Sequence, residues 1–205
     1  MCKFRGGFPP LFFMKNLLIC LLALFLLSCK ENWNIDSQRV KEILLQKAKD
    51  NKEHVIEFET RLGNFQIELS DQTPLHRINF IRLVKLGYFK DRYFYRNIYD
   101  AGMQGGGEYK DRLDYLVPAE YVDELKPVRG TIAMARYDEG NPEKASSSTE
   151  FFIITDTEEA KPYYKNYVVF GKVISGMAVL DSMKKQRSFF EKPVVPVKFS
   201  VKIIR

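Results

Sequence analysis

Residues 94–107 read FYRNIYDAGMQGGG, and this stretch indicates the fold more clearly than any other part of the chain. Aromatic and branched residues dominate positions 93–98, which is typical of a β-strand. Residues 100–102 predict a bend, and a second strand then leads into three glycines. Arg96 and Gln104 flank the bend, so pairing of the two strands would bring a guanidinium beside an amide on one face.

Two later stretches have the same strand character. Residues 147–155 read SSTEFFIIT, a predicted strand that begins with small polar residues. Residues 168–173 read VVFGKV, a continuous apolar run of the kind found in buried strands. Near the start of the globular part, residues 55–61 and 65–70 alternate in polarity around Leu62-Gly63-Asn64, which predicts a β-hairpin.

The whole pattern predicts a mainly β protein with eight strands and two helices. One helix should begin with Thr73 as its N-cap and Pro74 in its first turn, and the other should span residues 176–183. Glycines at the bends favour a closed antiparallel barrel, because closure removes exposed sheet edges. The predicted strands are 55–61, 65–70, the two within 93–107, 131–135, 151–155, 168–173 and 197–204.

Three ordered motifs resemble the cyclophilin family of peptidyl-prolyl isomerases. The family pattern F-H-R-x-I-x-x-F-M-x-Q-G-G is matched with unbroken spacing at Phe94, Arg96, Ile98, Gln104, Gly105 and Gly106. S-Q-F-F-I appears as TEFFI at 149–153, and V-F-G-K-V is intact at 169–173. The resemblance covers residues 55–205 and implies a closed eight-stranded antiparallel β-barrel that is capped by two helices.

The resemblance implies a peptidyl-prolyl cis-trans isomerase that needs no cofactor and no metal. Arg96 matches the family's catalytic arginine, which donates a hydrogen bond to the prolyl nitrogen. Gln104 matches the glutamine that binds substrate and supports the arginine, and Phe152 matches the floor of the proline pocket. Arg136 stands where the family binds the peptide through main-chain groups.

The chain departs from the family pattern at several of these positions. Tyr95 replaces a histidine before the arginine, and both residues can form hydrogen bonds. Ala101 and Gly102 stand where the family has Phe and Met, two walls of the proline pocket. Glu150 replaces a glutamine and adds a negative charge that could pair with Arg96.

Two tyrosines replace other residues of the expected pocket. Tyr163 and Tyr167 fall where many relatives carry Leu and His, and Tyr163 could rebuild a wall against Phe152. The alternative to an isomerase is therefore a weak or inactive cyclophilin-like module that only binds proline-containing or unfolded segments. An open, flat groove at Phe152 would count against catalysis.

The first 28 residues predict an export signal. Lys15 supplies positive charge, and residues 17–27 form an apolar run that is short for a membrane span. Leu26-Leu27-Ser28-Cys29 resembles a bacterial lipobox, which implies cleavage before Cys29 and acylation of its thiol. Met14 resembles a natural translation start, so residues 1–13 could be a misassigned extension. The alternative to a cleaved and acylated signal is a short uncleaved membrane anchor. Both versions predict an extracytoplasmic, membrane-tethered protein. Lys30 does not resemble the Asp that retains some lipoproteins at the inner membrane, so we expect the protein in the periplasm, at the outer membrane.

Residues 29–54 are predicted to form a lipidated tether with one short helix. Asp36 is a candidate N-cap, with Ile35 and Val40 spaced for a hydrophobic staple. Val40, Ile43, Leu44 and Ala48 would form a narrow apolar stripe. We expect the stripe to pack on the outside of the domain; a partner-binding helix is the alternative.

Charge and cysteine content exclude several other functions. The net charge is +6, but Lys3, Arg5 and Lys15 contribute three of these charges, and no basic cluster suggests nucleic acid. All three cysteines, Cys2 among them, lie in the first 29 residues, so the domain has no disulfide, zinc-thiolate site or thiol nucleophile. His76 is expected to be solvated near a helix start. The expected partners are proline-containing segments of unfolded or exported proteins and a membrane, and a monomer is expected.

Overall fold

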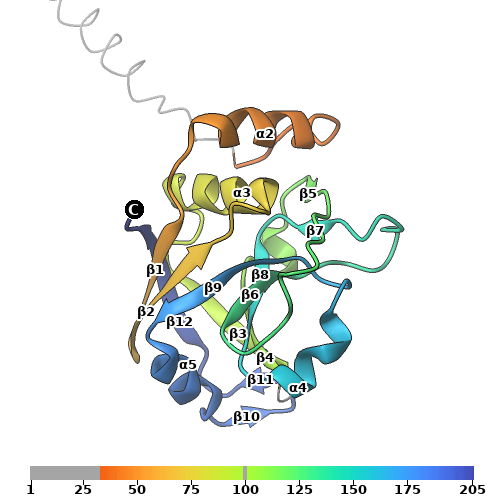
Figure 1. Ribbon diagram of the computed structural model, residues 1–205. Helices are drawn as coiled ribbons and strands as arrows, with labels where there is room; N and C mark the ends of the chain where they lie inside the picture. Colours follow the sequence, from red (N-terminus) through yellow and green to blue (C-terminus); the bar gives the residue numbers. More distant parts are fainter. Residues whose placement is uncertain (1–32, 99–100) are drawn as a thin grey trace, which may run out of the picture. The chain divides into compact units, whose positions relative to one another are not determined.

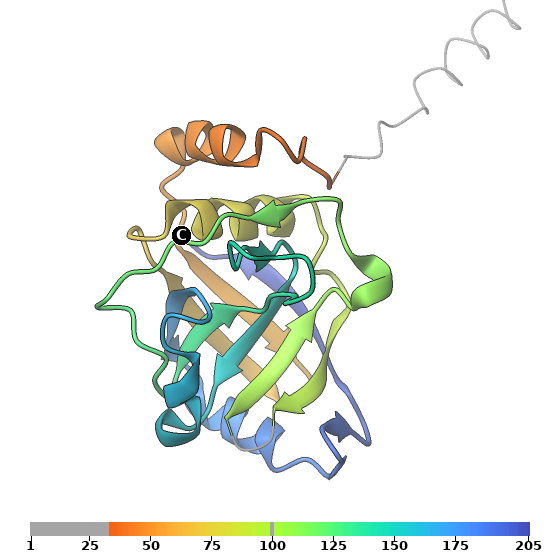
Figure 2. The same ribbon diagram turned by 90° about the vertical axis from the view of Figure 1, so that its right-hand side faces the viewer.

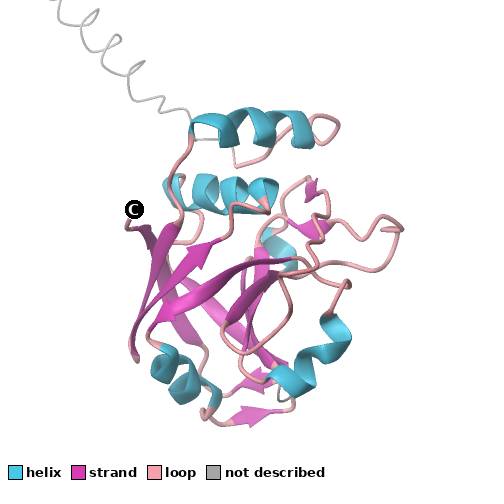
Figure 3. Ribbon diagram, in the orientation of Figure 1, coloured by secondary structure: helices cyan, strands magenta, loops and turns pink. Residues whose placement is uncertain are grey.

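The eight predicted strands all form, and they close into one antiparallel barrel (Figures 1 and 3). The computed structural model describes residues 33–98 and 101–205, so the predictions for residues 1–28 and for Cys29 lie outside the described residues. Around the barrel the order is β1-β12-β3-β4-β8-β6-β9-β2. These strands are β1 Val55–Thr60, β2 Gly63–Leu69, β3 Arg92–Ile98, β4 Gly102–Gly106, β6 Thr131–Met134, β8 Glu150–Ile154, β9 Val169–Ser175 and β12 Val197–Ile203.

The hairpin of β1 and β2 shows how local chemistry sets the register. Thr60 pairs with Gly63 across a two-residue turn, and the Thr60 hydroxyl donates to the Gly63 carbonyl oxygen at 2.7 Å. Gly63 has φ +123°, a conformation that side-chain-bearing residues rarely adopt. This register sets Phe58 opposite Phe65, and their rings stack with centroids 4.7 Å apart. A one-residue slip would turn both rings out of the core.

The interior of the barrel is filled by aromatic side chains from several strands. Phe58, Phe94, Phe151 and Phe199 are at most 2% exposed, and Phe94 and Phe199 have ring centroids 4.8 Å apart. Along β8 the side chains alternate, so Phe151 joins this core while Phe152 joins a second, smaller cluster on the outer face. The outer face of β8 is therefore where the predicted site must lie.

Helices cover both ends of the barrel (Figures 1 and 2). The two predicted helices are present as α3, Pro74–Lys85, and α5, Met177–Lys184. A short helix that the sequence reading missed, α4 Thr157–Ala160, continues into a 3₁₀ turn, Lys161–Tyr163. The Asp156 side chain caps α4 by accepting from Glu158 N at 2.9 Å, so the Asp-Thr-Glu-Glu sequence was an available helix-start signal.

Thr73 occupies the N-cap position of α3 and Pro74 begins the helix, as predicted, but the Thr73 side chain does not cap it. The Thr73 side chain makes no cap hydrogen bond; instead both carboxylate oxygens of Glu120 accept from the backbone N–H groups of Leu75 and His76, each at 3.1 Å. The same carboxylate contacts His76 Nδ1 at 2.7 Å, and Ser146 Oγ lies 3.0 Å from Nε2. His76 is thus buried and not solvated, because a distant loop segment supplies the cap.

The predicted tether helix is α2, Val40–Asp50, and it packs on α3 (Figure 1). Val40 and Leu44 are buried in the main core, and residues 33–205 form one compact unit. Asp36 does not cap the helix; its Oδ1 accepts from Gln38 N in the turn that precedes it. The expectation that the apolar stripe packs on the domain is confirmed. Among the described helices, none is long and apolar enough to cross a membrane.

Two small sheets lie outside the barrel, and neither was predicted. Strand β5, Leu116–Val117, pairs with β7, Ser146–Ser147, near α3. Strand β10, Ser188–Phe189, pairs with β11, Lys192–Pro193, at the end of the domain opposite α2 in both ribbon views (Figures 1 and 2). A 3₁₀ turn, Tyr109–Asp111, follows β4. We call residues 188–195 the β10–β11 arm.

The packing of α2 predicts that it unfolds together with the barrel. Replacing Leu44, which is 0% exposed, with Ala should lower the free energy of unfolding by about 2–4 kcal/mol because it leaves a cavity. The matched control is the next residue, Leu45, which is 39% exposed. Leu45→Ala should change the free energy by less than about 0.5 kcal/mol. Urea unfolding followed by tyrosine fluorescence measures both, and equal effects would contradict a structural role for α2.

Candidate active site

Three of the predicted site residues lie in one row across three neighbouring strands. Arg96 on β3 is directly opposite Gln104 on β4, and Gln104 is directly opposite Phe152 on β8. Phe152 in turn pairs with Ala133 on β6. Side chains that are paired in this way point to the same face of an antiparallel sheet. The prediction that Arg96 and Gln104 meet on one face is therefore confirmed.

A β-bulge at Tyr95 makes this arrangement possible. The register of β3 and β4 shifts between Phe94 and Arg96, so two consecutive residues oppose a single residue on β4. Gln104 contacts both of them, since its Nε2 donates to the Tyr95 hydroxyl at 3.1 Å and its Oε1 accepts from Arg96 Nη1 at 3.1 Å. Without the bulge, Tyr95 and Arg96 would point to opposite faces of the sheet.

The orientation of the Gln104 amide is fixed from both sides. Its Nε2 also donates to Glu150 Oε2 at 3.0 Å. A carboxylate can only accept and a guanidinium can only donate, so the amide oxygen must face Arg96. The substitution of Glu for the family's Gln at position 150 therefore orients the residue that holds the arginine.

Glu150 does not pair with Arg96, contrary to the possibility raised by the sequence. Its carboxylate is buried and accepts from the Tyr95 hydroxyl at 3.1 Å and from the Tyr137 hydroxyl. Three neutral donors thus replace an ion pair. Burial, and next the negative charge of Glu150, raise the pKa of Tyr95 well above its usual value. Burial and the hydrogen bond to Glu150 do the same to the pKa of Tyr137.

The partner of Arg96 is Glu191, on the turn of the β10–β11 arm. Glu191 Oε2 accepts from Arg96 Nε at 2.8 Å and from Nη2 at 2.7 Å. This hydrogen bond raises the pKa of Arg96, so the guanidinium stays charged. The sequence reading missed Glu191, which is 95 residues away from Arg96, and no local pattern connects the two.

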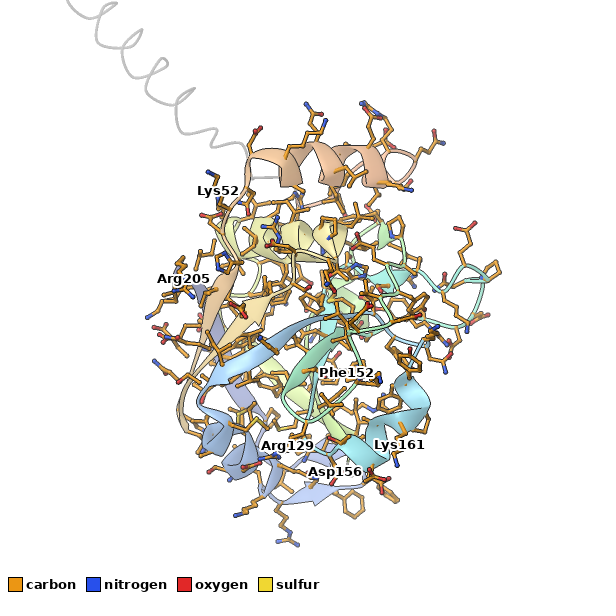
Figure 4. The ribbon with its side chains drawn as sticks, in the orientation of Figure 1. Lys52, Arg129, Phe152, Asp156, Lys161 and Arg205 are labelled. Carbon is orange, nitrogen blue, oxygen red and sulfur yellow. The ribbon has the colours of Figure 1, made fainter. Side chains whose placement is uncertain are left out.

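Three aromatic rings pack into an apolar cluster that includes Phe152, the last residue of this row. Phe152 meets Tyr163 edge-on with centroids 5.6 Å apart, and it meets Tyr167 edge-on at 5.2 Å. Tyr163 and Tyr167 contact each other at 5.3 Å. Burial raises the pKa of Tyr163, so its hydroxyl stays neutral. Figure 4 shows Phe152 on the side of the barrel that faces the segment carrying Lys161.

Among the described residues, no neighbouring side chain fills the positions where the family has Phe and Met and this chain has Ala101 and Gly102. A Cβ at Gly102 would lie 2.4 Å from the Ile153 carbonyl oxygen, so no side chain fits there without backbone movement. Ala101 is buried, and its carbonyl oxygen accepts from Thr155 N at 2.9 Å. The apolar surface comes instead from the tyrosines of the 157–167 segment.

Arg136 contributes its side chain as well as its main chain. Its Nε donates to Asp138 at 2.8 Å, its Nη1 donates to the Asn166 carbonyl oxygen, and its guanidinium lies 5.0 Å from the centre of the Tyr167 ring. The side chain thus joins the loop after β6 to the loop that carries the pocket tyrosines. The main-chain role expected for Arg136 remains a prediction.

A groove of about 910 Å³ lies on the other side of Arg96. The barrel contributes Tyr95, Arg96, Gln104, Glu108, Tyr137 and Glu150 to it, and the β10–β11 arm contributes residues 189–194. Phe152 does not line it, so Arg96 and Gln104 border this groove while Phe152, at the other end of the row, belongs to the aromatic cluster. Within residues 33–98 and 101–205, no group of three or more His, Cys, Asp or Glu side chains could hold a metal ion.

Comparison with known proteins identifies relatives in sequence and in structure. The chain is 36% identical over 137 residues to a peptidyl-prolyl cis-trans isomerase of Acinetobacter baylyi, covering 63% of this chain and 71% of that protein. It is 30% identical over 158 residues to an isomerase of Streptomyces antibioticus, covering 69% and 93% respectively. A crystal structure of a Cryptosporidium parvum cyclophilin superposes with a TM-score of 0.64 at 27% identity, over 75% of this chain and 98% of that one.

Residues 55–203 match the family described as cyclophilin type peptidyl-prolyl cis-trans isomerase/CLD. The match covers every strand of the barrel, β1 to β12. It also contains the row of Arg96, Gln104 and Phe152, so the family resemblance first noted in the motifs holds for the whole domain. The chain belongs to the cyclophilin-type family of peptidyl-prolyl cis-trans isomerases.

Proposed function

We propose that this isomerase works through the Arg96 guanidinium, which donates a hydrogen bond to the prolyl nitrogen as the X–Pro bond twists. The observation that carries this is the position of Arg96, which lines a groove in the same row as the aromatic cluster of Phe152, with Gln104 and Glu191 holding it. The related Cryptosporidium protein has also been solved in the presence of the dipeptide Ala-Pro. By analogy, we infer that proline-containing peptide segments are the substrates here.

The reaction needs little chemistry from the protein. The barrier to rotation is about 18–20 kcal/mol, because amide resonance is lost as the bond twists. The prolyl nitrogen then becomes pyramidal and regains a lone pair. A fixed cationic donor aimed at that lone pair stabilises the twisted state more than either planar state, which is what lowers a barrier. No covalent bond forms or breaks.

Arg96 can remain a donor to substrate while its own contacts hold it. A guanidinium carries five N–H groups, and the contacts to Glu191 and Gln104 use one on Nε, one on Nη2 and one on Nη1. One N–H on each terminal nitrogen is therefore left for substrate. The Arg96 side chain is 45% exposed, so these two groups can be reached from outside. Rigid placement also lowers the entropy that is lost on binding.

The proline ring would rest against the aromatic cluster. Phe152 is only 3% exposed, so the accessible surface of the cluster belongs to Tyr163 and Tyr167, which are partly buried and meet Phe152 edge-on. The tyrosines provide apolar area where the chain lacks the Phe and Met of the family, and their hydroxyls add polar edges. We therefore expect the residue preference before proline to differ from that of relatives with an aliphatic wall.

The test of this proposal is prolyl isomerisation of a tetrapeptide by wild type, Arg96→Ala and Arg96→Lys. Loss of a preorganised donor typically costs a factor of about 10²–10³ in kcat, and we expect that loss for Arg96→Ala. Arg96→Lys keeps the charge but not the rigid fork, so it should recover only part of the rate. Isothermal urea unfolding controls for stability, because Arg96→Ala also leaves Glu191 without its partner.

Two results would contradict the proposed role of Arg96. The first is an Arg96→Ala variant that keeps wild-type kcat/KM across peptides that vary the residue before proline. The second is a wild-type protein that matches the uncatalysed rate with every peptide. In the second case a peptide-binding module, the alternative considered from the sequence, would be the better account.

We further propose that the protein is exported and lipid-anchored, and that it assists the folding of exported proteins. The support is in the sequence: Lys15, the apolar run of residues 17–27, and Cys29 after Leu26-Leu27-Ser28. A thioether-linked lipid on Cys29 would hold the domain at an extracytoplasmic membrane surface, where newly exported chains with slow X–Pro bonds arrive.

Metabolic labelling with palmitate tests the anchor. The wild-type chain should incorporate label and fractionate with membranes, whereas Cys29→Ser should incorporate none. Cys20→Ser is the matched control, because Cys20 lies within the apolar run and should not be acylated. Labelling of Cys29→Ser, or loss of label in Cys20→Ser alone, would contradict the proposed lipid site.

A further inference from the structure

The β10–β11 arm carries the most exposed large apolar side chains of the described domain. Phe190 is 89% exposed and Phe189 is 74% exposed, while Val194 and Val195 are each 57% exposed. The two phenyl rings contact each other with centroids 4.7 Å apart. No other residues described in the structure combine this degree of exposure with apolar side chains of this size. Contiguous exposed apolar surface of this kind usually marks a binding site.

The backbone of the arm is shaped to present Phe190. The loop between β10 and β11 has two residues, Phe190 and Glu191, and Phe190 has φ +52°. Glycine or asparagine is the usual residue at a left-handed position in such a turn, and a bulky side chain there is strained. A strained residue that the chain retains in spite of its cost often serves function rather than folding.

The arm is fixed to the catalytic strand at the residue beside Arg96. Asn97 N donates to the Glu191 carbonyl oxygen at 2.6 Å, and Asn97 Nδ2 donates to Ser188 Oγ. Glu191 also holds the Arg96 guanidinium. Phe189, Phe190 and Val194 line the same groove as Arg96 and Gln104. The apolar surface of the arm therefore continues the surface on which the substrate is proposed to bind.

We propose that the β10–β11 arm is a docking site for an extended apolar segment of the substrate polypeptide. The segment belongs to the same substrate chain whose X–Pro bond lies at Arg96. The inference rests on the proposed function of Arg96. The arm makes the enzyme prefer unfolded chains with apolar residues near the proline over short peptides. Such residues are exposed only before folding, so the preference selects clients in need of isomerisation.

A lipid surface is a weaker candidate for the occupant. Lys192 lies in the arm and Arg187 directly precedes it, so basic residues stand beside the phenylalanines, a composition that membrane-binding loops also have. However, Phe189, Phe190 and Val194 line one groove together with Arg96 and Gln104. This continuity with the proposed substrate site favours a peptide over a lipid surface.

The experiment compares two substrates in wild type and in Phe189→Ser/Phe190→Asn. One substrate is a tetrapeptide with one X–Pro bond, and the other extends the same tetrapeptide on both sides with segments rich in Leu and Val. Asn tolerates the left-handed turn, so the variant should melt at the same or a higher temperature than wild type. The control is Leu45→Ser/Ile204→Ser, which removes two exposed apolar side chains near α2 and the C-terminus.

Wild type and the control should have a kcat/KM for the long peptide at least about fivefold above that for the tetrapeptide, through a lower KM. The arm variant should lose most of that ratio. An unchanged ratio in the arm variant, or no preference in wild type, would overturn the proposal. A second measurement, flotation with vesicles of phosphatidylethanolamine and phosphatidylglycerol, tests the lipid alternative. Vesicle binding that the arm variant alone loses, with its peptide ratio unchanged, would assign the surface to lipid.

A further measurement distinguishes failure of the docking proposal from failure of the proposed role of Arg96. Fluorescence anisotropy of the labelled long peptide measures binding without turnover. If Arg96→Ala turns over the tetrapeptide as fast as wild type, the proposed function fails, yet weaker binding by the arm variant than by wild type would still support docking. If turnover depends on Arg96 but both proteins bind the long peptide equally, the docking proposal alone is overturned.

Discussion

The register between β3 and β4 is the constraint on which the site depends. It sets Arg96 opposite Gln104, and the bulge at Tyr95 brings two consecutive side chains of β3 to the same amide. In a closed barrel this register cannot slip by one residue without turning Phe94 out of the core. The aromatic interior therefore fixes the geometry of the outer face, including the position of Arg96 relative to Gln104.

The groups around Arg96 form a chain of hydrogen bonds with a definite direction. Glu150 accepts from Gln104, and Gln104 accepts from Arg96 through its other end. Glu191 then holds the far side of the guanidinium. Buried carboxylates usually need a cation, but here Glu150 is satisfied by hydroxyl and amide donors. This leaves the charge of Arg96 available for substrate and for Glu191, and it explains why a Glu in place of the family's Gln is tolerated.

Much of this site could be predicted from the sequence, because it lies on strands with clear patterns. Arg96, Gln104 and Phe152 were found through motif spacing, and the closure of Tyr163 against Phe152 was anticipated. Contacts made by irregular segments could not be predicted. Glu191 and the Glu120 cap of α3 come from segments without apolar periodicity, far along the chain from their partners. The β10–β11 arm has strands of two residues each, too short for any alternation to appear.

We infer that Glu191 is a positioning residue that keeps the Arg96 guanidinium aimed at the substrate. Measuring kcat for Glu191→Ala beside Glu191→Gln tests this role most directly. Gln at this position can still accept from Nε and Nη2, whereas Ala cannot. We expect Glu191→Ala to lower kcat about tenfold with little change in KM, the effect of losing charge-assisted hydrogen bonds, and Glu191→Gln to restore most of it. An Ala variant that is as fast as wild type or faster would contradict the account, because Glu191 would then compete with substrate for the arginine.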